Sequence, residues 1–166
     1  MRILQILPEL NVGGVETGTV DFAKYLKDHG HGSIVVSNGG GLVKELLDYD
    51  IRHYELPVHK KNIFTAWTCI EKLRDIILTE KIDIVHARSR VPAWISYFAC
   101  RRTPAQLITT CHGHYSVSFY SKVMAFPKLI IVPSKVIGRH MIERFHVSPE
   151  SVRHIPRSVD LERFQV

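Results

Sequence analysis

Seven short runs of mostly apolar residues recur along the chain, and helix-like segments or loops separate them. Continuous apolar runs of about four to six residues are typical of parallel strands that are covered on both faces, whereas antiparallel strands alternate more cleanly. We therefore predict strands at 2–7, 33–37, 51–56, 82–86, 106–111, 129–132 and 152–155.

In the segments between these runs, the apolar residues have the spacing of a helix face. Gly30 is a good helix stop, Pro92 suits a first helical turn, and Ser134 can cap the helix that follows it. The predicted helices are 15–29, 42–49, 63–80, about 92–102, 117–125 and 135–145. This order predicts an α/β fold: a doubly wound, mostly parallel, Rossmann-like sheet of about seven strands.

Length and composition limit the number of domains and the kinds of partner and metal site that the chain can have. A chain of 166 residues is long enough for one domain with a sizeable core and too short for two full α/β domains. The 22 Lys and Arg against 16 Asp and Glu give a net charge of +6, which favours anionic partners without choosing among them. The basic residues are spread along the chain, so a nucleic-acid tail is not indicated. The three cysteines have no metal-site spacing, so we expect buried free thiols.

The sequence gives no sign of a signal peptide or a membrane-spanning helix, because no segment reaches about 18 uncharged apolar residues. We expect a cytoplasmic protein with peripheral membrane contact. His59, Lys60 and Lys61 precede a helix that carries Phe64 and Trp67, and such a basic and aromatic helix end suits an anionic interface. The apolar stripe of the same helix, from Ile63 through Trp67 and Ile70 to Ile77, is expected to face the core.

The first predicted strand is followed by a loop that contains Gly13 and Gly14 and leads into a helix with Glu16 in its first turn. Glycines let the backbone approach a ligand, and a helix N-terminus attracts phosphate. The dinucleotide fingerprint GxGxxG and the phosphate-binding loop GxxxxGK[ST] are both absent. This weakens an NAD-binding or ATP-cleaving interpretation, and a plain turn is the structural alternative.

Two later loops carry further candidate residues at the ends of strands. Arg88 and Arg90 flank Ser89 after the fourth strand, and two arginines can clamp a phosphate or carboxylate. His112 follows the fifth strand, where a histidine can bond a sugar hydroxyl or transfer a proton. Because parallel strands end at one edge of a sheet, we expect Gly14, Arg88 and His112 to converge there.

These motifs, in their order and spacing, resemble the family-4 retaining glycosyltransferases of the GT-B fold, over nearly the whole chain. The matching pieces are Gly13-Gly14 with Glu16, His112-Gly113, Val132-Pro133-Ser134, and Ile155-Pro156 with Val159 and Asp160. Arg157 and Ser158 replace the common Asn-Gly of the last motif. The His-Ala-Arg-Ser-Arg and His-Gly-x-Tyr-Ser-Val segments are similar to those of Gram-negative enzymes that build lipopolysaccharide.

The resemblance implies a role for each candidate. His112 is the implied catalytic residue, and Gly13, Gly14 and Glu16 form the implied donor-phosphate loop. The implied acceptor-binding residues are Arg88, Ser89, Arg90, His112, Gly113 and Tyr115. The family uses a nucleotide-sugar donor as substrate and requires no divalent metal, so no metal site and no other cofactor are expected.

The resemblance also implies a domain arrangement. Residues 1–156 are expected to form the N-terminal, acceptor-side domain, and 157–166, with Arg157 and Asp160, the start of an interdomain linker. The C-terminal donor domain is not in this sequence, so we expect no transfer to a glycolipid acceptor by this chain alone. Two alternatives remain open, namely a nucleotide-binding regulatory domain and a protein-interaction domain. A nucleic-acid binder, suggested only by charge, ranks last.

Overall fold

The computed structural model describes residues 1–157. Seven strands form one parallel sheet in the order β3-β2-β1-β4-β5-β6-β7. The strands are β1 (Arg2–Ile6), β2 (Gly32–Ser37), β3 (Arg52–Glu55), β4 (Ile84–Ala87), β5 (Gln106–Thr110), β6 (Ile130–Val132) and β7 (Val152–His154). The predicted α/β class and the parallel sheet are therefore confirmed, with strand ends shifted by one or two residues.

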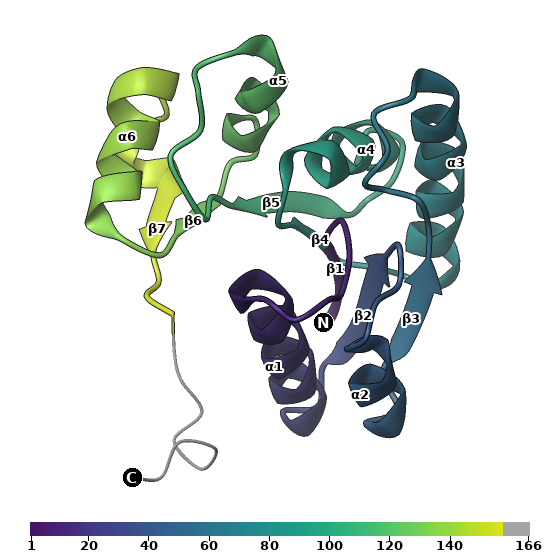
Figure 1. The fold of residues 1–166 in the computed structure, drawn as a ribbon. Helices are drawn as coiled ribbons and strands as arrows, with labels where there is room; N and C mark the ends of the chain where they lie inside the picture. The colour runs from purple at the N-terminus through teal and green to yellow at the C-terminus, as the bar shows by residue number, and fades with distance from the viewer. Residues whose placement is uncertain (158–166) are drawn as a thin grey trace, which may run out of the picture.

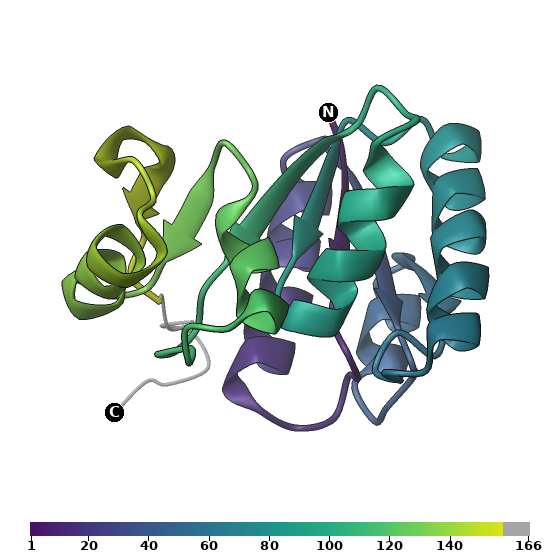
Figure 2. The same ribbon diagram turned by 90° about the horizontal axis from the view of Figure 1, so that it is seen from above.

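Helices connect the strands and cover the sheet on two sides (Figure 1). They are α1 (Gly14–Asp28), α2 (Val43–Asp48), α3 (Ile63–Thr79), α4 (Arg90–Cys100), α5 (Phe119–Lys122), α6 (Lys135–Phe145) and two 3₁₀ turns, η1 (Val123–Ala125) and η2 (Pro149–Ser151). The helices α1 and α2 lie on one side, and α3 and α4 pack against each other on the opposite side (Figures 1 and 2).

Local sequence explains several helix ends. Ser134 caps α6, because its side-chain oxygen accepts a hydrogen bond from the backbone N–H of Ile137. Asn62 caps α3 in the same way, accepting from the N–H groups of Phe64 and Thr65. The helix predicted at 117–125 is shorter than expected: Ser118 caps it, and its second half tightens into η1.

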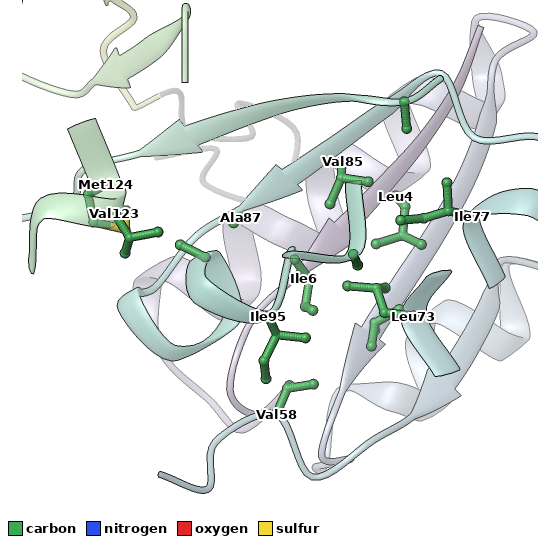
Figure 3. Close-up of a cluster of buried hydrophobic side chains, with 14 of the residues drawn as sticks. Leu4, Ile6, Val58, Leu73, Ile77, Val85, Ala87, Ile95, Val123 and Met124 are labelled. Carbon is green, nitrogen blue, oxygen red and sulfur yellow. The ribbon is translucent and has the colours of Figure 1, made fainter. Parts of the chain in front are cut away.

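The larger core lies between the sheet and the side covered by α3 and α4. Its buried side chains include Leu4, Ile6, Leu73, Val85 and Ile95, which Figure 3 shows pointing toward one another. Burying one such side chain contributes roughly 1.5–3 kcal/mol to folding. A second core lies beneath α1 and α2 and is formed by Leu7, Leu10, Val20, Ala23, Val35, Leu46 and Ile51.

The predicted apolar stripe of α3 is only partly correct. Leu73 and Ile77 are buried, but Ile63 is 77% exposed and Trp67 is 67% exposed. The reason is direction, because the buried face of α3 runs through Cys69, Leu73 and Ile77. Ile63 and Trp67 lie beside this face, so their side chains point to solvent although Cys69 in the same part of the helix is buried.

The three cysteines are free, as expected, and Cys69 and Cys111 are fully buried. Burial raises the pKa of the Cys111 thiol to about 12, so this thiol stays protonated and unreactive at neutral pH. None of the helices that the structure describes has the length and apolar character needed to cross a membrane.

Candidate functional site at the carboxyl edge of the sheet

The sheet reverses its strand order between β1 and β4, and ligands of such folds bind at the carboxyl ends of the strands beside this reversal. The loops that leave β1, β4 and β5 all start there, because these three strands are neighbours. The segment after β7 reaches the same place, because Arg157 contacts His112 and lies beside Gly14. The expected convergence of Gly14, Arg88 and His112 is confirmed by the contacts that follow.

The Gly13-Gly14 loop opens α1 without a side-chain cap. Gly13 is the N-cap in extended conformation, and the side chain of Glu16 folds back against it. At Gly14, an added Cβ would lie 2.5 Å from Nη1 of Arg157. A larger residue at Gly14 would therefore push this guanidinium away from the helix.

Arg88 points to the side of the sheet that α1 covers. Its guanidinium carbon lies 6.0 Å from the centre of the Phe22 ring, and its Nη1 is 4.0 Å from where a Cβ on Gly18 would be. Its Nε is buried and has no hydrogen-bond partner among the described residues. Burial, together with the nearby charge of Arg157, lowers the pKa of Arg88 to about 10.

Arg90 takes a different direction. Its guanidinium carbon lies 5.2 Å from the Tyr115 ring and 5.0 Å from the Tyr120 ring, and its Nη1 donates to Oγ of Ser121 at 3.4 Å. The hypothesis that Arg88 and Arg90 form one clamp is therefore wrong, because their side chains have separate surroundings. Ser89 between them is half-buried and is the N-cap of α4, without a side-chain capping bond.

His112 sits just beyond β5, in contact with the segment that follows β7. Its Nδ1 accepts a hydrogen bond from Nη2 of Arg157 at 3.3 Å, and its Nε2 is buried without a partner among the described residues. Burial lowers the pKa of His112 to about 4, with smaller contributions from Arg88 and Arg157. The imidazole is therefore neutral at pH 7 and suited to hydrogen bonding.

The residues after His112 bridge to α6. Gly113 is half-buried with open space where a Cβ would point, and His114 is exposed. The backbone carbonyl of Tyr115 accepts a hydrogen bond from Nε2 of His140 at 2.9 Å. Burial raises the pKa of Tyr115 to about 12, so its hydroxyl remains a donor.

His86 belongs to this cluster although it was not predicted as a site residue. It lies on β4, two positions before Arg88, and strand alternation places both on the same face. Its Nε2 lies 2.6 Å from Oγ1 of Thr110, and its ring contacts Phe22 edge-on at 6.3 Å between centroids. Burial holds the pKa of His86 well below 6.5, so the His86 ring is neutral at pH 7. The buried ring supports the position of the site residues that follow β4.

Arg157, predicted only as a linker residue, is the other unexpected member of the cluster. It contacts both Gly14 and His112, so it belongs to the same edge. The sequence offered one indication that Arg157 belongs to the site. Arg157 comes shortly after the seventh strand, and the carboxyl end of that strand lies at the same edge. Asp160, the other predicted linker residue, lies outside the residues that the structure describes.

A group of exposed apolar side chains lies outside the site, where α3 and α5 begin. Ile63 and Phe64, 77% and 81% exposed, begin α3, and Phe119, 76% exposed, begins α5. The two helix ends are neighbours, because the amino group of Lys61 lies 5.6 Å from the centre of the Tyr120 ring. Trp67 completes this group, which we call the aromatic surface: Ile63, Phe64, Trp67 and Phe119.

Comparisons with known proteins agree with this architecture. The family model described as Glycosyltransferase Family 4 matches residues 12–163. A crystal structure of a glycosyltransferase from Rickettsia africae ESF-5 is 39% identical with a TM-score of 0.88, and the match covers 99% of this chain and 45% of that one. Anabaena HepE in complex with UDP-glucose shares the fold at 17% identity and a TM-score of 0.74, over 98% of this chain and 45% of that chain.

A curated human relative is also similar. This protein, one component of the phosphatidylinositol N-acetylglucosaminyltransferase, is 26% identical over 167 residues, which covers 90% of this chain and 34% of the relative. The chain thus spans less than half the length of each of these three proteins. Because the family model matches most of the residues, the chain belongs to glycosyltransferase family 4.

Proposed function

We propose that this chain is the acceptor-binding half of a retaining glycosyltransferase that moves a sugar from a nucleotide-sugar to lipopolysaccharide or another glycolipid. The observation that carries the proposal is the meeting of Gly14, Arg88 and His112 at the strand-order reversal of the sheet. The nucleotide-sugar donor is supported by the UDP-glucose in the HepE complex, and a lipid acceptor by the phosphatidylinositol in the name of the human relative.

Each predicted residue then has a physical role. The uncapped N-terminus of α1 at Gly13 and Gly14 offers free N–H groups to the donor phosphates, with Glu16 folded beside them. The free Nε2 of the neutral His112 donates a hydrogen bond to a sugar hydroxyl at the reacting centre. Arg90 with Tyr115, and Ser89 and Gly113 beside them, form the wall that receives the acceptor.

Transfer needs donor and acceptor held together, so we propose that the 166 residues alone do not turn over. The test compares the chain with a fusion to the C-terminal half of the Rickettsia africae protein, which matches at 39% identity. Both are incubated with a panel of nucleotide-sugars and lipopolysaccharide or glycolipid acceptors. We expect sugar transfer only from the fusion, with the anomeric configuration retained. Robust turnover by the chain alone would refute the half-enzyme proposal.

The same experiment separates the alternatives. A nucleotide-binding regulatory domain would bind NAD or ATP and not a nucleotide-sugar, and an interaction domain would bind another chain without any transfer. We also propose that no divalent metal takes part, so the fusion should keep its rate in EDTA. A loss of rate that Mg²⁺ or Mn²⁺ restores would contradict this part.

We further propose that the chain is cytoplasmic and rests on the inner membrane through the aromatic surface. Phe64 and Trp67 lie in the first turns of α3 with Lys60 and Lys61 beside them. Exposed aromatic side chains next to basic residues favour an anionic bilayer interface. A lipid-linked acceptor would reach the site from the same side, because Lys61 and Arg90 both contact Tyr120.

A further inference from the structure

The side chain of Arg157 is held between parts of the chain that are far apart in sequence. The backbone N–H of Ile155 donates to the carbonyl of Val132 at 3.0 Å, so the segment after β7 stays attached to the end of β6. From there, Nη2 of Arg157 reaches Nδ1 of His112 beyond β5. Gly14 leaves room on the side of α1, because a Cβ there would lie 2.5 Å from Nη1 of Arg157. The guanidinium therefore has a defined place between α1 and the end of β5.

The imidazole of His112 has no other hydrogen-bond partner within residues 1–157. A neutral imidazole can carry its proton on either ring nitrogen, and the hydrogen bond at one nitrogen decides which. Arginine can only donate, so Nδ1 must accept and the proton must sit on Nε2. Among the described residues, Arg157 is therefore the group that selects the tautomer of His112 and fixes the direction of its ring.

The surroundings of His112 favour the neutral ring. Burial is the main reason that its pKa is low, and the positive charges of Arg88 and Arg157 add to this effect. His86, on the neighbouring strand, is buried and also neutral. Neither Arg88 nor Arg157 forms a salt bridge within the part of the chain that the structure describes, so no carboxylate offsets their charge there. A neutral ring with its proton on Nε2 can donate from that nitrogen and cannot accept there.

The other ring nitrogen of His112 lacks a partner. Nε2 is buried, and none of the described residues bonds to it. Buried polar groups are nearly always hydrogen-bonded, so a free donor at the carboxyl edge of the sheet points to an acceptor atom of a bound substrate. A general base would need the opposite arrangement, with a free lone pair on Nε2.

We propose that Arg157 is a positioning residue. It holds His112 with the proton on Nε2, so that this nitrogen donates a hydrogen bond to the substrate and does not act as a general base. Arg157 acts through His112 in this role and needs no contact with the reacting atoms. That the substrate is a sugar rests on the proposed function, whereas the tautomer of His112 is a property of this chain.

NMR of the isotope-labelled 166-residue chain measures the tautomer directly. Long-range proton–nitrogen spectra distinguish a ring nitrogen that carries a proton from one that does not. His112→Gln identifies the signals of His112 among the ten histidines. We expect the proton on Nε2 in the wild type at about pH 7. In Arg157→Met, which has no donor, the form with the proton on Nδ1 should become populated, and the pKa of His112 should rise because one positive charge is lost.

The matched control is Arg153→Met. Arg153 is exposed on β7, and its guanidinium donates to the backbone carbonyls of Glu150 and Val152, so its replacement removes the same charge without touching His112. A proton on Nδ1 in the wild type, or an unchanged tautomer in Arg157→Met, would overturn the proposal. Equal changes in Arg153→Met and Arg157→Met would also overturn it, because they would show an effect of net charge alone.

Sugar transfer by the fusion with the C-terminal half gives a second measurement. Arg157→Met should lower kcat at least about tenfold with a smaller change in KM, because His112 is present but no longer held in one tautomer. Arg153→Met should keep the wild-type kcat. Full activity in Arg157→Met would refute the positioning role. A wild-type fusion without any transfer would instead refute only the proposed function, since the tautomer is measured on the chain alone.

Discussion

Arg157 donates a hydrogen bond from Nη2 to Nδ1 of His112 over 3.3 Å, and the two residues are 45 positions apart. Arginine is always a donor, so this bond fixes the imidazole in the tautomer with a proton on Nε2. It also ties the segment after β7 to the end of β5. The free Nε2–H is therefore held toward the carboxyl edge of the sheet, where substrate is proposed to bind.

Replacing His112 by alanine should slow sugar transfer in the fusion enzyme. The variant loses the free donor at Nε2, and we expect kcat/KM to fall about 10²-fold. Steady-state kinetics with the preferred nucleotide-sugar give the measurement. His114→Ala is the matched control, because His114 is exposed two positions away. If both variants lose activity equally, the role assigned to His112 is wrong.

The folding stability of the chain should decrease as the pH is lowered through the range in which histidines protonate. The folded pKa of His112 is about 4 and that of His86 is also lowered from 6.5, in both cases mainly through burial. A folded pKa below the unfolded value means that the contribution is complete above pH 6.5 and is lost as pH falls toward 4. Denaturant unfolding at several pH values between about 7.5 and about 4 measures this.

His86→Gln should flatten this pH dependence, because glutamine does not titrate and can still bond Thr110. The exposed His154 is the control, and His154→Gln should leave the slope unchanged. An unchanged slope in His86→Gln would show that another group causes the loss of stability.

Gly40→Ala should destabilise the fold strongly. Gly40 has a φ of 137°, and an added Cβ would lie 2.5 Å from the carbonyl oxygen of Leu10. The strain of the positive φ adds to the clash with the Leu10 backbone, so we expect a loss of about 2–4 kcal/mol in the free energy of unfolding. Gly41→Ala is the control, since a Cβ there meets nothing within 4 Å. Equal stabilities of the two variants would contradict the prediction.

The Phe64→Ser and Trp67→Ser double variant should lose affinity for anionic vesicles. These side chains are 81% and 67% exposed, so the fold should tolerate the change. Co-sedimentation with vesicles rich in anionic lipid, compared with neutral vesicles, measures binding. Leu78→Ser is the matched control, because Leu78 is 51% exposed at the other end of α3. Equal sedimentation of wild type with both vesicle types would remove the membrane proposal.

Glu80→Gln should destabilise the amino edge of the sheet by about 1–3 kcal/mol. The Glu80 carboxylate accepts hydrogen bonds at 2.6 Å from Arg2, Arg52 and the Tyr54 hydroxyl. The Tyr54 bond, followed by the bond and charge of Arg52, lowers the pKa of Glu80, so its contribution is lost as pH falls below about 4.5. The cost of the variant should therefore shrink at about pH 3.

Urea unfolding at about pH 7 and about pH 3 provides the measurement for Glu80. Glu71 forms a pair with Arg74 one helical turn away and is 47% exposed, so Glu71→Gln should cost less than about 0.5 kcal/mol. A cost for Glu80→Gln no larger than that of Glu71→Gln would show that this network contributes little.

The elements of this fold could be predicted from the sequence because their signals are local. Apolar runs such as 33–37 and caps such as Ser134 depend on a few neighbouring residues, and both are where they were expected. The position of Gly14, Arg88 and His112 at one edge of the sheet could also be predicted from the sequence, since parallel strands bring their carboxyl ends together. The exposure of Ile63 and Trp67 could not be predicted, because apolar spacing alone does not tell which part of a wide apolar face will pack against the rest of the fold.

The sequence by itself determined the parallel sheet, its carboxyl edge and most of the residues that lie there. Only the tertiary structure decided that Arg88 and Arg90 diverge, that His86 supports the site, and that Arg157 returns to His112. The physical reason is that backbone periodicity is set within a few residues. Side-chain directions at a sheet edge are set instead by packing against helices and loops distant in the chain.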